Sequence, residues 1–283
     1  MDIINKVEKK TIDTIKKFKL LNKKDRILVA CSGGKDSTTI LYILKKQGFN
    51  PEAITVDAVI GNYTKANLEN IKKFCKQHKI KLNVISFREE FGYSLCYIRS
   101  LLKQNGINLT SCAICGVLRR YLLNKYARKL KATKLVTGHN QNDEAQSIIM
   151  NLLKNNLDLL ARQGPSSGTS KNKKFIQRVK PLYFVTEDEV IKYSKKMKFP
   201  VKYIPCPCRV GVYRCLINEQ LTKHESTNPK IHENIIKWFL STTLELKKQY
   251  KSDKQQLYCK NCNEPSKRDY CMTCQILSKI KKE

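Results

Sequence analysis

Short apolar runs alternate with amphipathic stretches along the first two thirds of the chain. Four of these runs have the length and apolar content of buried strands: 26–31, 52–59, 81–87 and 134–139. The other stretches have helical spacing, which predicts helices over 35–48, 64–78, 94–106, 116–131 and 142–155. Parallel strands joined by helical crossovers form a sheet that helices cover on both faces. The pattern therefore predicts an α/β fold with a doubly wound parallel sheet.

Further elements are predicted on either side of this alternation. Near the N-terminus, apolar residues at roughly helical spacing predict a helix: Ile4, Val7, Ile12, Ile15 and Phe18. Residues 162–174 are rich in Gly, Ser, Pro and Lys and predict an exposed loop, whereas 175–185 and 186–199 predict a strand and a capped helix. We divide the chain into an N-terminal helix (1–23), an α/β catalytic domain (24–228), a helical connection (229–256) and a C-terminal module (257–283).

The chain is strongly basic. Its 283 residues include 55 Lys and Arg against 24 Asp and Glu, a formal net charge of +31, and the 41% of hydrophobic residues excludes a disordered basic tail. Cationic side chains release counterions when they neutralise phosphates, so a nucleic acid is the expected partner; a generally Lys-rich proteome is the alternative. No signal peptide and no membrane-spanning apolar run is visible, which predicts a cytoplasmic protein without a membrane partner.

The heptapeptide CSGGKDS lies between the first predicted strand and the helix that follows it. Gly33 and Gly34 permit a tight turn that exposes backbone N–H groups, and the positive end of the helix dipole points to the same place. Such a turn can cradle a pyrophosphate, with Ser32 and Ser37 as hydrogen-bond donors and Asp36 as a Mg²⁺ ligand or a brace of the loop. The spacing is that of neither a Walker A loop nor a dinucleotide fingerprint, and an ordinary strand–helix turn is the alternative.

A pair of cysteines stands next to a pair of arginines. Twelve cysteines in a cytoplasmic chain indicate metal or sulfur chemistry rather than a disulfide framework. Cys112 and Cys115 lie just before the helix predicted over 116–131, so the helix dipole, Arg119 and Arg120 should lower the pKa of both thiols.

Two cysteines do not complete a metal site, so a third ligand must come from elsewhere in the chain. The segment IPCPCRVGVYRC offers Cys206, Cys208 and Cys215. Three thiolates would leave one iron of an iron–sulfur cluster open to a ligand such as sulfide; a zinc half-site and a redox dithiol are the alternatives. The remaining cysteines of the domain fall in predicted strands or helices and are expected to be buried apolar side chains: Cys31, Cys75 and Cys96.

The C-terminal module carries two further CxxC pairs, formed by Cys259, Cys262, Cys271 and Cys274. Four thiolates in two knuckles match a closed tetrahedral Zn²⁺ site. So short a segment buries little core by itself, and zinc would therefore supply its folding free energy. Its lysines suggest an additional contact with RNA, and a purely structural staple is the alternative.

Taken together, these motifs resemble a known family. SGGKDS resembles the SGGxDS loop of PP-loop ATP pyrophosphatases, which cleave ATP between its α and β phosphates and transfer AMP to a carbonyl oxygen. SCAICGVLRRY, VTGHNQNDEAQSIIMNLL, RVKPL and the region from Tyr203 to Arg214 resemble the TtcA/TtuA family of tRNA 2-thiolation enzymes, from about Lys24 onward. The C-terminal cysteine module makes the chain most similar to the archaeal and eukaryotic 2-thiouridine branch.

The resemblance implies a role for particular residues. Cys112, Cys115 and Cys206 would hold a 4Fe–4S cluster, with Cys206 preferred over Cys208 or Cys215 because the family's Tyr–Arg pair is spaced from it. ATP would be bound by the ends of three strands and the glycine loop: Ala30, Ser32, Gly33, Gly34, Asp36, Ser37, Val56 and Gly138.

The same resemblance assigns an acid and several cations. Asp143 matches an acidic position that the family uses in catalysis, acting on Mg²⁺ or in proton transfer. Arg119, Arg120 and Lys180 would neutralise phosphate or tRNA charge, and a solvated lysine at a strand end is the alternative for Lys180.

The function implied is ATP-dependent 2-thiouridine synthesis in tRNA. The C2 oxygen of the base would take AMP from ATP, and sulfide held at the cluster would displace that AMP. Free sulfide or a sulfur-carrier protein would be the sulfur donor, and the family implies a homodimer. One alternative is a cluster-free enzyme with a persulfide on Cys112 or Cys115. Another is a zinc-stabilised RNA-binding protein with a decayed ATP site.

The second alternative is motivated by departures from the family pattern, at Ala58, Val59 and Asn142. The chain also begins directly with a helix, where TtuA-branch members usually carry another zinc module.

Overall fold

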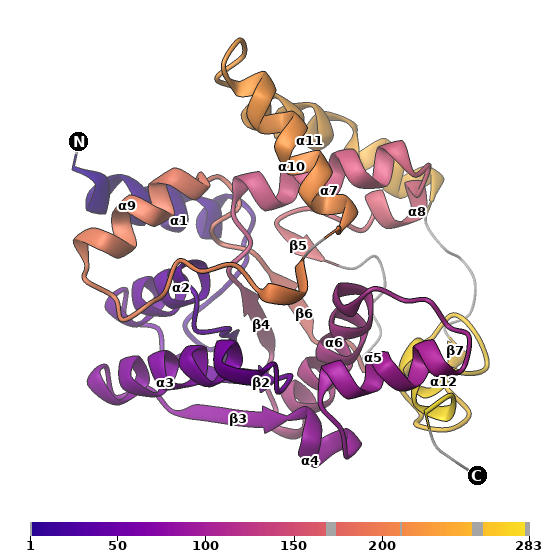
Figure 1. Cartoon of the computed structure of the whole chain (residues 1–283). Helices are drawn as coiled ribbons and strands as arrows, with labels where there is room; N and C mark the ends of the chain where they lie inside the picture. The colour runs from indigo at the N-terminus through magenta and orange to yellow at the C-terminus, as the bar shows by residue number, and fades with distance from the viewer. Residues whose placement is uncertain (1, 168–173, 210, 251–256, 281–283) are drawn as a thin grey trace.

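A mixed six-stranded sheet forms the centre of the molecule. The structure is a computed structural model that describes residues 2–167, 174–209, 211–250 and 257–280. The strand order is β3-β2-β1-β4-β6-β5 (Figure 1). The strands are β1 Ile27–Ala30, β2 Glu52–Asp57, β3 Leu82–Ser86, β4 Lys134–Thr137, β5 Ser166–Ser167 and β6 Gln177–Val179. All neighbours pair in parallel except β5, which pairs antiparallel with β6 at the edge.

The predicted doubly wound sheet is confirmed, with helices on both faces. One face is covered by α1 Ile3–Lys17, α2 Lys35–Lys46, α3 Gly61–Gln77 and α9 Glu187–Lys196. The other is covered by α4 Phe87–Phe91, α5 Leu95–Gln104, α6 Ser111–Lys129 and α12 Met272–Ser278. Side chains of β1 alternate between two cores: Ile27 and Val29 pack into the first, and Leu28 into the second. Strands apolar on both sides explain the short continuous runs in the sequence.

Helices beyond the sheet form a third packed group. These are α7 Gln141–Leu153, α8 Leu157–Leu160, α10 Tyr213–Glu225 and α11 Ile231–Gln249, with a 3₁₀ turn η1 at Pro207–Arg209 (Figure 1). Their shared core contains Ile148, Leu160 and Phe239. Neither α10 nor η1 is predicted by apolar spacing, and β5 lies in the segment predicted as a loop. The predicted helical connection reaches 256, and its residues 251–256 lie outside the described part of the chain.

Helix α1 is fixed to the sheet domain by buried acids. Glu8 accepts hydrogen bonds from Lys46 Nζ at 2.8 Å and from Tyr193 Oη at 2.9 Å, and Glu189 accepts from Lys10 Nζ at 2.8 Å. These contacts join α1 to α2 and α9, around the fully buried Val7.

The C-terminal module, with strands β7 Leu257–Tyr258 and β8 Pro265–Ser266, docks on α6 through one acid. Glu264 is buried and accepts two hydrogen bonds from the Arg128 guanidinium and one from Asn124 Nδ2 at 3.1 Å. Ile276 of α12 completes the contact within the second core.

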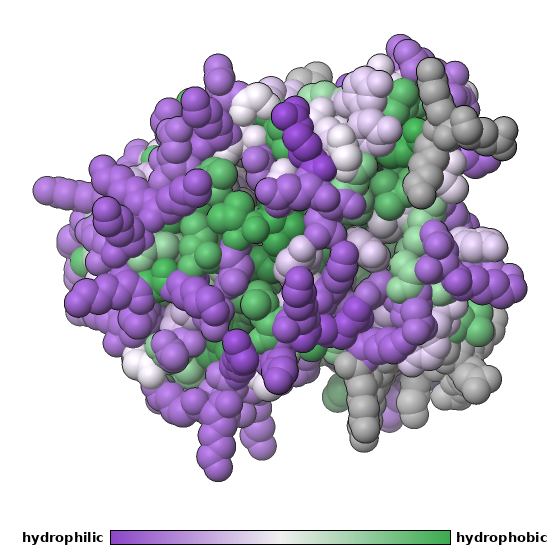
Figure 2. All heavy atoms as spheres, turned by 90° about the horizontal axis from the view of Figure 1, so that it is seen from below, coloured by the Kyte–Doolittle hydropathy of each residue, from purple (hydrophilic) through white to green (hydrophobic). Residues whose placement is uncertain are grey.

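Hydrophilic side chains dominate the surface seen from below, where they surround an apolar area (Figure 2). Strand β3 is the sheet edge on this side, and its Val84 is 43% exposed. None of the helices in the described ranges has the length and apolar content needed to cross a membrane.

Removing the docking acid should loosen the module. Glu264→Ala removes the module's hydrogen bonds with Arg128 and Asn124, which keep only the Lys174 carbonyl as a partner. The loss should lower the free energy of opening of the module by about 2–3 kcal/mol. Hydrogen exchange of the α12 amides measures this opening. As a control, Asp269→Ala removes only the exposed pair with Lys260 and should leave exchange unchanged. Equal exchange in both variants would contradict the docking role of Glu264.

Candidate active site

The glycine loop follows β1 where the sheet order reverses direction, with β2 on one side and β4 on the other. Gly33 has a φ of +80°, and a Cβ built on it would lie 2.1 Å from the backbone oxygen of Asn67 in α3. On the opposite side, a Cβ on Gly138 would lie 2.8 Å from the backbone of Asp36 and Ser37. The loop is therefore enclosed by backbone on two sides, and only glycine fits at either position.

Hydrogen bonds within the loop set its shape. Ser37 Oγ accepts from the Ser32 N–H and donates to the Gly34 carbonyl, both at 3.2 Å, and Ser32 Oγ accepts from the Gly34 N–H at 3.3 Å. Gly34 is the N-cap of α2 and offers no side chain to the free N–H groups of the first turn. The positive end of α2 is thus open to an anion, as the sequence predicts.

Two carboxylates meet beside this loop through one asparagine. Asn140 Nδ2 donates to Asp36 Oδ1 at 2.9 Å, and Asn140 Oδ1 accepts from the Asp143 N–H at 3.0 Å, which caps α7. Burial raises the pKa of both carboxyls; Lys35 and Asn140 oppose the rise at Asp36, and Arg214 opposes it at Asp143. Because Asp143 also repels Asp36, a divalent cation between them would be stabilised.

Several neighbours of these carboxylates come from distant segments of the chain. Lys35 Nζ lies 3.0 Å from both Asp36 Oδ2 and Glu187 Oε1. The Arg214 guanidinium donates to the Asp143 carbonyl at 3.2 Å and to Ser147 Oγ at 2.9 Å. These contacts bring α9 and α10 to the loop, and tertiary packing alone creates them.

The positions that depart from the family pattern have structural roles here. Asn142 Oδ1 accepts the Glu187 N–H at 3.0 Å and so stabilises the start of α9. Ala58 is fully buried, and the Val59 N–H donates to Asp57 Oδ1 at 2.7 Å in a tight turn after β2. None of the three removes the glycine loop or Asp143.

The strand-end positions differ in what they can offer a nucleotide. Ala30 ends β1 and is partly exposed, whereas the Val56 side chain is buried, so only its backbone can face a ligand. Lys180 Nζ forms a 2.7 Å ion pair with Glu144, and the two side chains are 12% and 2% exposed. The alternative of a solvated lysine at this strand end is therefore wrong, and Glu144 already balances the Lys180 charge.

The first turns of α6 carry two of the predicted cluster cysteines, Cys112 and Cys115, and the third, Cys206, lies near them. The helix begins at Ser111, capped by Thr110, so Cys112 and Cys115 lie inside it and not before it. Cys206, on the segment that leads into η1, lies close enough to raise the pKa of both thiols. Figure 1 shows this segment passing beside α6 at the carboxyl end of the sheet.

The predicted lowering of the two thiol pKa values is wrong. Burial raises the pKa of Cys112 and Cys115, and neighbouring thiols add to the rise. Arg119 and Arg120 do oppose it at Cys115, as the sequence suggests, but burial dominates.

A short chain of contacts connects the thiols to the glycine loop through α3. Asn67 lies against Gly33, and Tyr63 stands one turn earlier on α3, where Asn67 opposes the rise that burial causes in the Tyr63 pKa. Tyr63 in turn lies near Cys115 and Cys206. Helix α3 therefore lies between the glycine loop and two of the three thiols, Cys115 and Cys206.

The donor set fits a cluster better than a single ion. Among the described residues, Cys112, Cys115 and Cys206 are not within 4.8 Å of one another, as the ligands of one ion would be. In an iron–sulfur cluster each thiolate binds a different iron, so wider spacing is required. Cys215 Sγ instead donates to the Arg209 carbonyl at 3.5 Å.

The three cysteines that the sequence analysis expects to be buried differ in their exposure. Cys31 and Cys75 are buried, as predicted. Cys96 is exposed, so the expectation of a buried side chain is wrong there, because it lies on the outer side of α5.

Two arginines face each other beside the thiols. Burial, and to a lesser extent repulsion from Arg120, lower the pKa of Arg178 to about 10. The Arg120 guanidinium folds back over Gly116, in the same turn as Cys115. Neither guanidinium forms an ion pair with any acid of the described residues. The sequence identifies Arg120 but not Arg178, whose strand position only the fold brings here.

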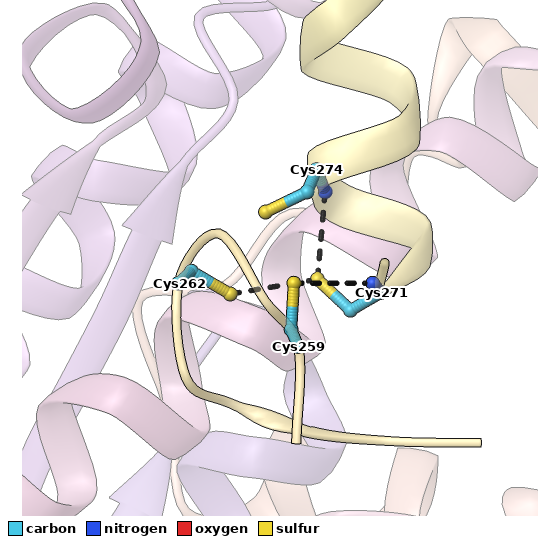
Figure 3. A group of neighbouring side chains, drawn as sticks. All are labelled: Cys259, Cys262, Cys271 and Cys274. Carbon is cyan, nitrogen blue, oxygen red and sulfur yellow. Dashed lines mark hydrogen bonds between the residues drawn. The ribbon is translucent and has the colours of Figure 1, made fainter. Parts of the chain in front are cut away.

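The four C-terminal thiols point toward one another (Figure 3). Their sulfurs all lie within 4.8 Å, and the Cys271 and Cys274 N–H groups donate to Cys259 and Cys271 sulfurs at 3.3 and 3.4 Å. Four convergent thiols can hold a metal ion in a closed site.

This fold and this loop define a PP-loop nucleotide-binding protein. A family model described as PP-loop domain matches residues 5–204. The chain is 34% identical over 276 residues to the tRNA-5-methyluridine(54) 2-sulfurtransferase of Pyrococcus horikoshii, covering 98% of this chain and 86% of that protein. The same-named protein of Thermotoga maritima is 30% identical over 276 residues, with 98% and 88% covered. The chain belongs to the PP-loop family and, within it, to the group of tRNA 2-thiolation sulfurtransferases.

A solved structure has the same fold over nearly the whole length. It is the U34-tRNA thiolase NcsA from Methanococcus maripaludis with its [4Fe-4S] cluster, with a TM-score of 0.78 and 24% identity. The match covers 98% of this chain and 87% of that chain.

Asn140 connects the two carboxylates, which gives a testable expectation. Asn140→Ala should lower stability by about 1 kcal/mol through the lost helix cap. It should also weaken Mg²⁺–ATP binding about 10-fold, because Asp36 loses its donor. Calorimetric titration with a non-hydrolysable ATP analogue measures the affinity. Ser94→Ala, which removes the α5 cap, should cost similar stability and leave affinity unchanged; equal affinities in the two variants would refute the connecting role.

Proposed function

We propose that the protein is an ATP-dependent sulfurtransferase that replaces the C2 oxygen of a tRNA uridine with sulfur. The observation that supports this most is that α3 contacts the nucleotide loop through Asn67 and carries Tyr63, which lies near Cys115 and Cys206. The relatives' names refer to 2-thiolation of 5-methyluridine 54 and to U34, so a uridine is the expected base.

The glycine loop and the paired acids would perform the first half-reaction. The backbone N–H group of Gly33 and the first turn of α2 would bind the phosphates of ATP. Ser32, Gly34 and Ser37 would shape the loop through the hydrogen bonds among them. Asp36 and Asp143 would hold Mg²⁺, which neutralises charge as pyrophosphate leaves. The adenosine would lie over the ends of β1, β2 and β4, near Ala30, Val56 and Gly138. The C2 oxygen of uridine then attacks the α phosphate.

The second half-reaction belongs to the thiol site. Cys112, Cys115 and Cys206 would hold a 4Fe–4S cluster, and when bound it would supply an iron without a protein ligand that can carry sulfide. Tyr63 lies near Cys115 and Cys206, and the Arg119 guanidinium opposes the rise that burial causes in the pKa of Cys115. Displacement of AMP by sulfur requires no net redox change.

Two arginines beside the thiols would bind phosphates of the RNA. Arg120 and Arg178 repel each other and have no acid partner in the described part of the chain, so a phosphate between them would relieve the repulsion. The net charge of +31 favours the same polyanion. A uridine must leave its stack to reach the loop. The sulfur donor and a homodimer are implied only by the resemblance and stay predictions.

The C-terminal module would be a structural zinc site. Its four thiols leave no coordination position open, and Glu264 fixes the module to α6, away from the nucleotide loop. We assign Zn²⁺ to Cys259, Cys262, Cys271 and Cys274.

Two variants separate the half-reactions. With ATP, Mg²⁺, sulfide and tRNA under anaerobic conditions, Asp143→Ala should lose thiolation by about 10²–10⁴-fold and pyrophosphate release with it, while keeping the brown colour of a cluster. Cys112→Ser should lose both colour and thiolation but still bind ATP. Mass spectrometry of tRNA nucleosides and fragments identifies the product and its position.

Three outcomes decide between the alternatives. A colourless and fully active Cys112→Ser variant would exclude the cluster and favour a persulfide enzyme. ATP turnover that does not depend on tRNA would exclude the whole proposal. If a strain without the gene kept its normal level of 2-thiouridine in tRNA, that result would also exclude the whole proposal.

Zinc removal should affect stability and not colour. Cys271→Ser should lose one bound zinc per chain and expose residues 257–280 to protease, because the module folds around its metal. The visible absorption of the Cys112 site should be unchanged. Metal analysis and peptide mapping measure both; a loss of iron together with zinc would contradict two separate sites.

A further inference from the structure

One histidine beside the glycine loop has no role in the reaction described above. His139 lies just after β4, between Gly138 and Asn140. A Cβ on Gly138 would lie 2.8 Å from the backbone of Asp36, and Asn140 Nδ2 donates to the carboxylate of that same residue at 2.9 Å. Contacts on both sides of His139 therefore fix its backbone next to the loop that would bind the phosphates of ATP.

The imidazole is exposed and is oriented by the strand that precedes it. His139 Nδ1 lies 2.9 Å from Oγ1 of Thr137, the last residue of β4. Side chains alternate along a strand, so Thr137 faces the same side of the sheet as Leu135, which belongs to the second core. Cys115 and Cys206 pack against that core as well. The hydrogen bond to Thr137 thus holds the ring on the thiol side of the sheet, at its carboxyl end.

Charged side chains from three places in the fold surround the ring. These are Arg178 and Lys180 in and after β6, Glu144 of α7 and Arg214 of α10. Arg178 lies opposite Leu135 in the parallel pair of β4 and β6, so both β6 cations point to the thiol side of the sheet. Desolvation by the surrounding protein lowers the pKa of His139, the three cations lower it further, and Glu144 opposes them. The imidazole is therefore neutral at pH 7 and has a lone pair that can accept a proton.

The first half-reaction releases a proton that no residue described so far accepts. Uracil carries a hydrogen on N3, and this hydrogen must leave as a proton when the C2 oxygen bonds to phosphorus, because the base would otherwise become a cation. Asp36 and Asp143 would be occupied by Mg²⁺. His139 Nε2, by contrast, forms no hydrogen bond with any residue in the described part of the chain. A uridine that reaches the glycine loop from the thiol side would pass this nitrogen.

We infer that His139 is the general base that takes the N3 proton of the uracil ring while its C2 oxygen attacks the α phosphate. This inference rests on the proposed function and adds a catalytic residue to its first half-reaction. The Nδ1 hydrogen is donated to Thr137 Oγ1, which leaves the lone pair on Nε2 to accept the proton.

The step balances in atoms and charge. The bond from the C2 oxygen to the α phosphorus forms, and the bond from that phosphorus to the bridging oxygen breaks, with its electron pair leaving on pyrophosphate. The N3 proton moves to His139 Nε2, and the electron pair of the N–H bond forms the N3–C2 double bond as the C2–O bond becomes single. The exposed imidazolium then passes its proton to water. In the second half-reaction, hydrosulfide brings the proton that N3 carries in the 2-thiouridine product.

Bound substrates would strengthen the base. The cations around the ring disfavour the imidazolium, and phosphates of ATP and RNA placed beside them would offset that repulsion. Proton transfer to His139 is therefore favoured in the complex that holds both substrates.

The test follows pyrophosphate release in one turnover of the full-length protein with its cluster, given ATP, Mg²⁺ and a tRNA transcript but no sulfide. His139→Gln, which carries no base, should slow this release by about 10²–10⁴-fold at pH 7. Its rate should then rise about 10-fold per pH unit as the uracil ionises unaided, whereas the wild type should change little above the pKa of the imidazole. His224→Gln, at an exposed histidine of α10, is the matched control and should behave as the wild type.

A second substrate separates base catalysis from a structural role. In a transcript made with 5-fluorouridine the N3 hydrogen is more acidic, so the gap in rate between His139→Gln and the wild type should shrink by about 10-fold or more. His139→Asn, whose amide can keep the hydrogen bond to Thr137, should behave as His139→Gln does. Both variants should bind a non-hydrolysable ATP analogue as the wild type does and keep the colour of the cluster.

The possible outcomes lead to different conclusions. A gap in rate that is equal at every pH and on both transcripts would overturn the inference. Weaker binding of the ATP analogue by both variants would also overturn it, because His139 would then hold the nucleotide. A wild type that releases no pyrophosphate with tRNA would refute the proposed function itself, whereas an active wild type matched by His139→Gln would refute the inference alone.

Discussion

The close approach of three backbone segments at the glycine loop is the constraint on which the rest of the structure depends. Gly33 touches the backbone of α3, and Gly138 lets β4 approach the first turn of α2. These contacts fix the distance from the loop to its neighbours, and Gly34 leaves the first turn of α2 without a side-chain cap. On one side α3 extends to the thiols through Tyr63; on the other, β4 leads into Asn140 and Asp143. This packing positions both the thiols and the acids, and it is possible only because Gly33 and Gly138 carry no side chain.

Helix α6 connects the two cysteine groups. Its first turns carry Cys112 and Cys115, and its later turns carry Asn124 and Arg128, which hold Glu264 of the C-terminal module. A rigid helix transmits its position along its length, so docking of the module helps to orient the end that carries the thiols. The C-terminal module can therefore affect the geometry of the thiol site although it takes no part in the reaction.

Burial controls the electrostatics of the site. Carboxyls, thiols and arginines all have their charged forms disfavoured there, and the partners that oppose this effect are few. Such a site has unsatisfied charge of both signs. It is therefore suited to bind metal ions at Asp36 and Asp143 and phosphate at Arg120 and Arg178.

The sequence by itself determined the strand–helix alternation, the glycine turn and the C-terminal cysteine group, because local periodicity and fixed spacing encode them; the set of Cys112, Cys115 and Cys206 came from the family resemblance. It gave no sign of α10, of the Lys35–Glu187 pair or of Arg178 facing Arg120, since these depend on contacts between distant segments. It also misjudged Cys96 and the thiol pKa values, because exposure and desolvation are properties of the packed molecule. Tertiary structure decided that Cys112 of α6 meets the backbone of Cys208, because residues ninety or more positions apart in the sequence come together only once the sheet has formed.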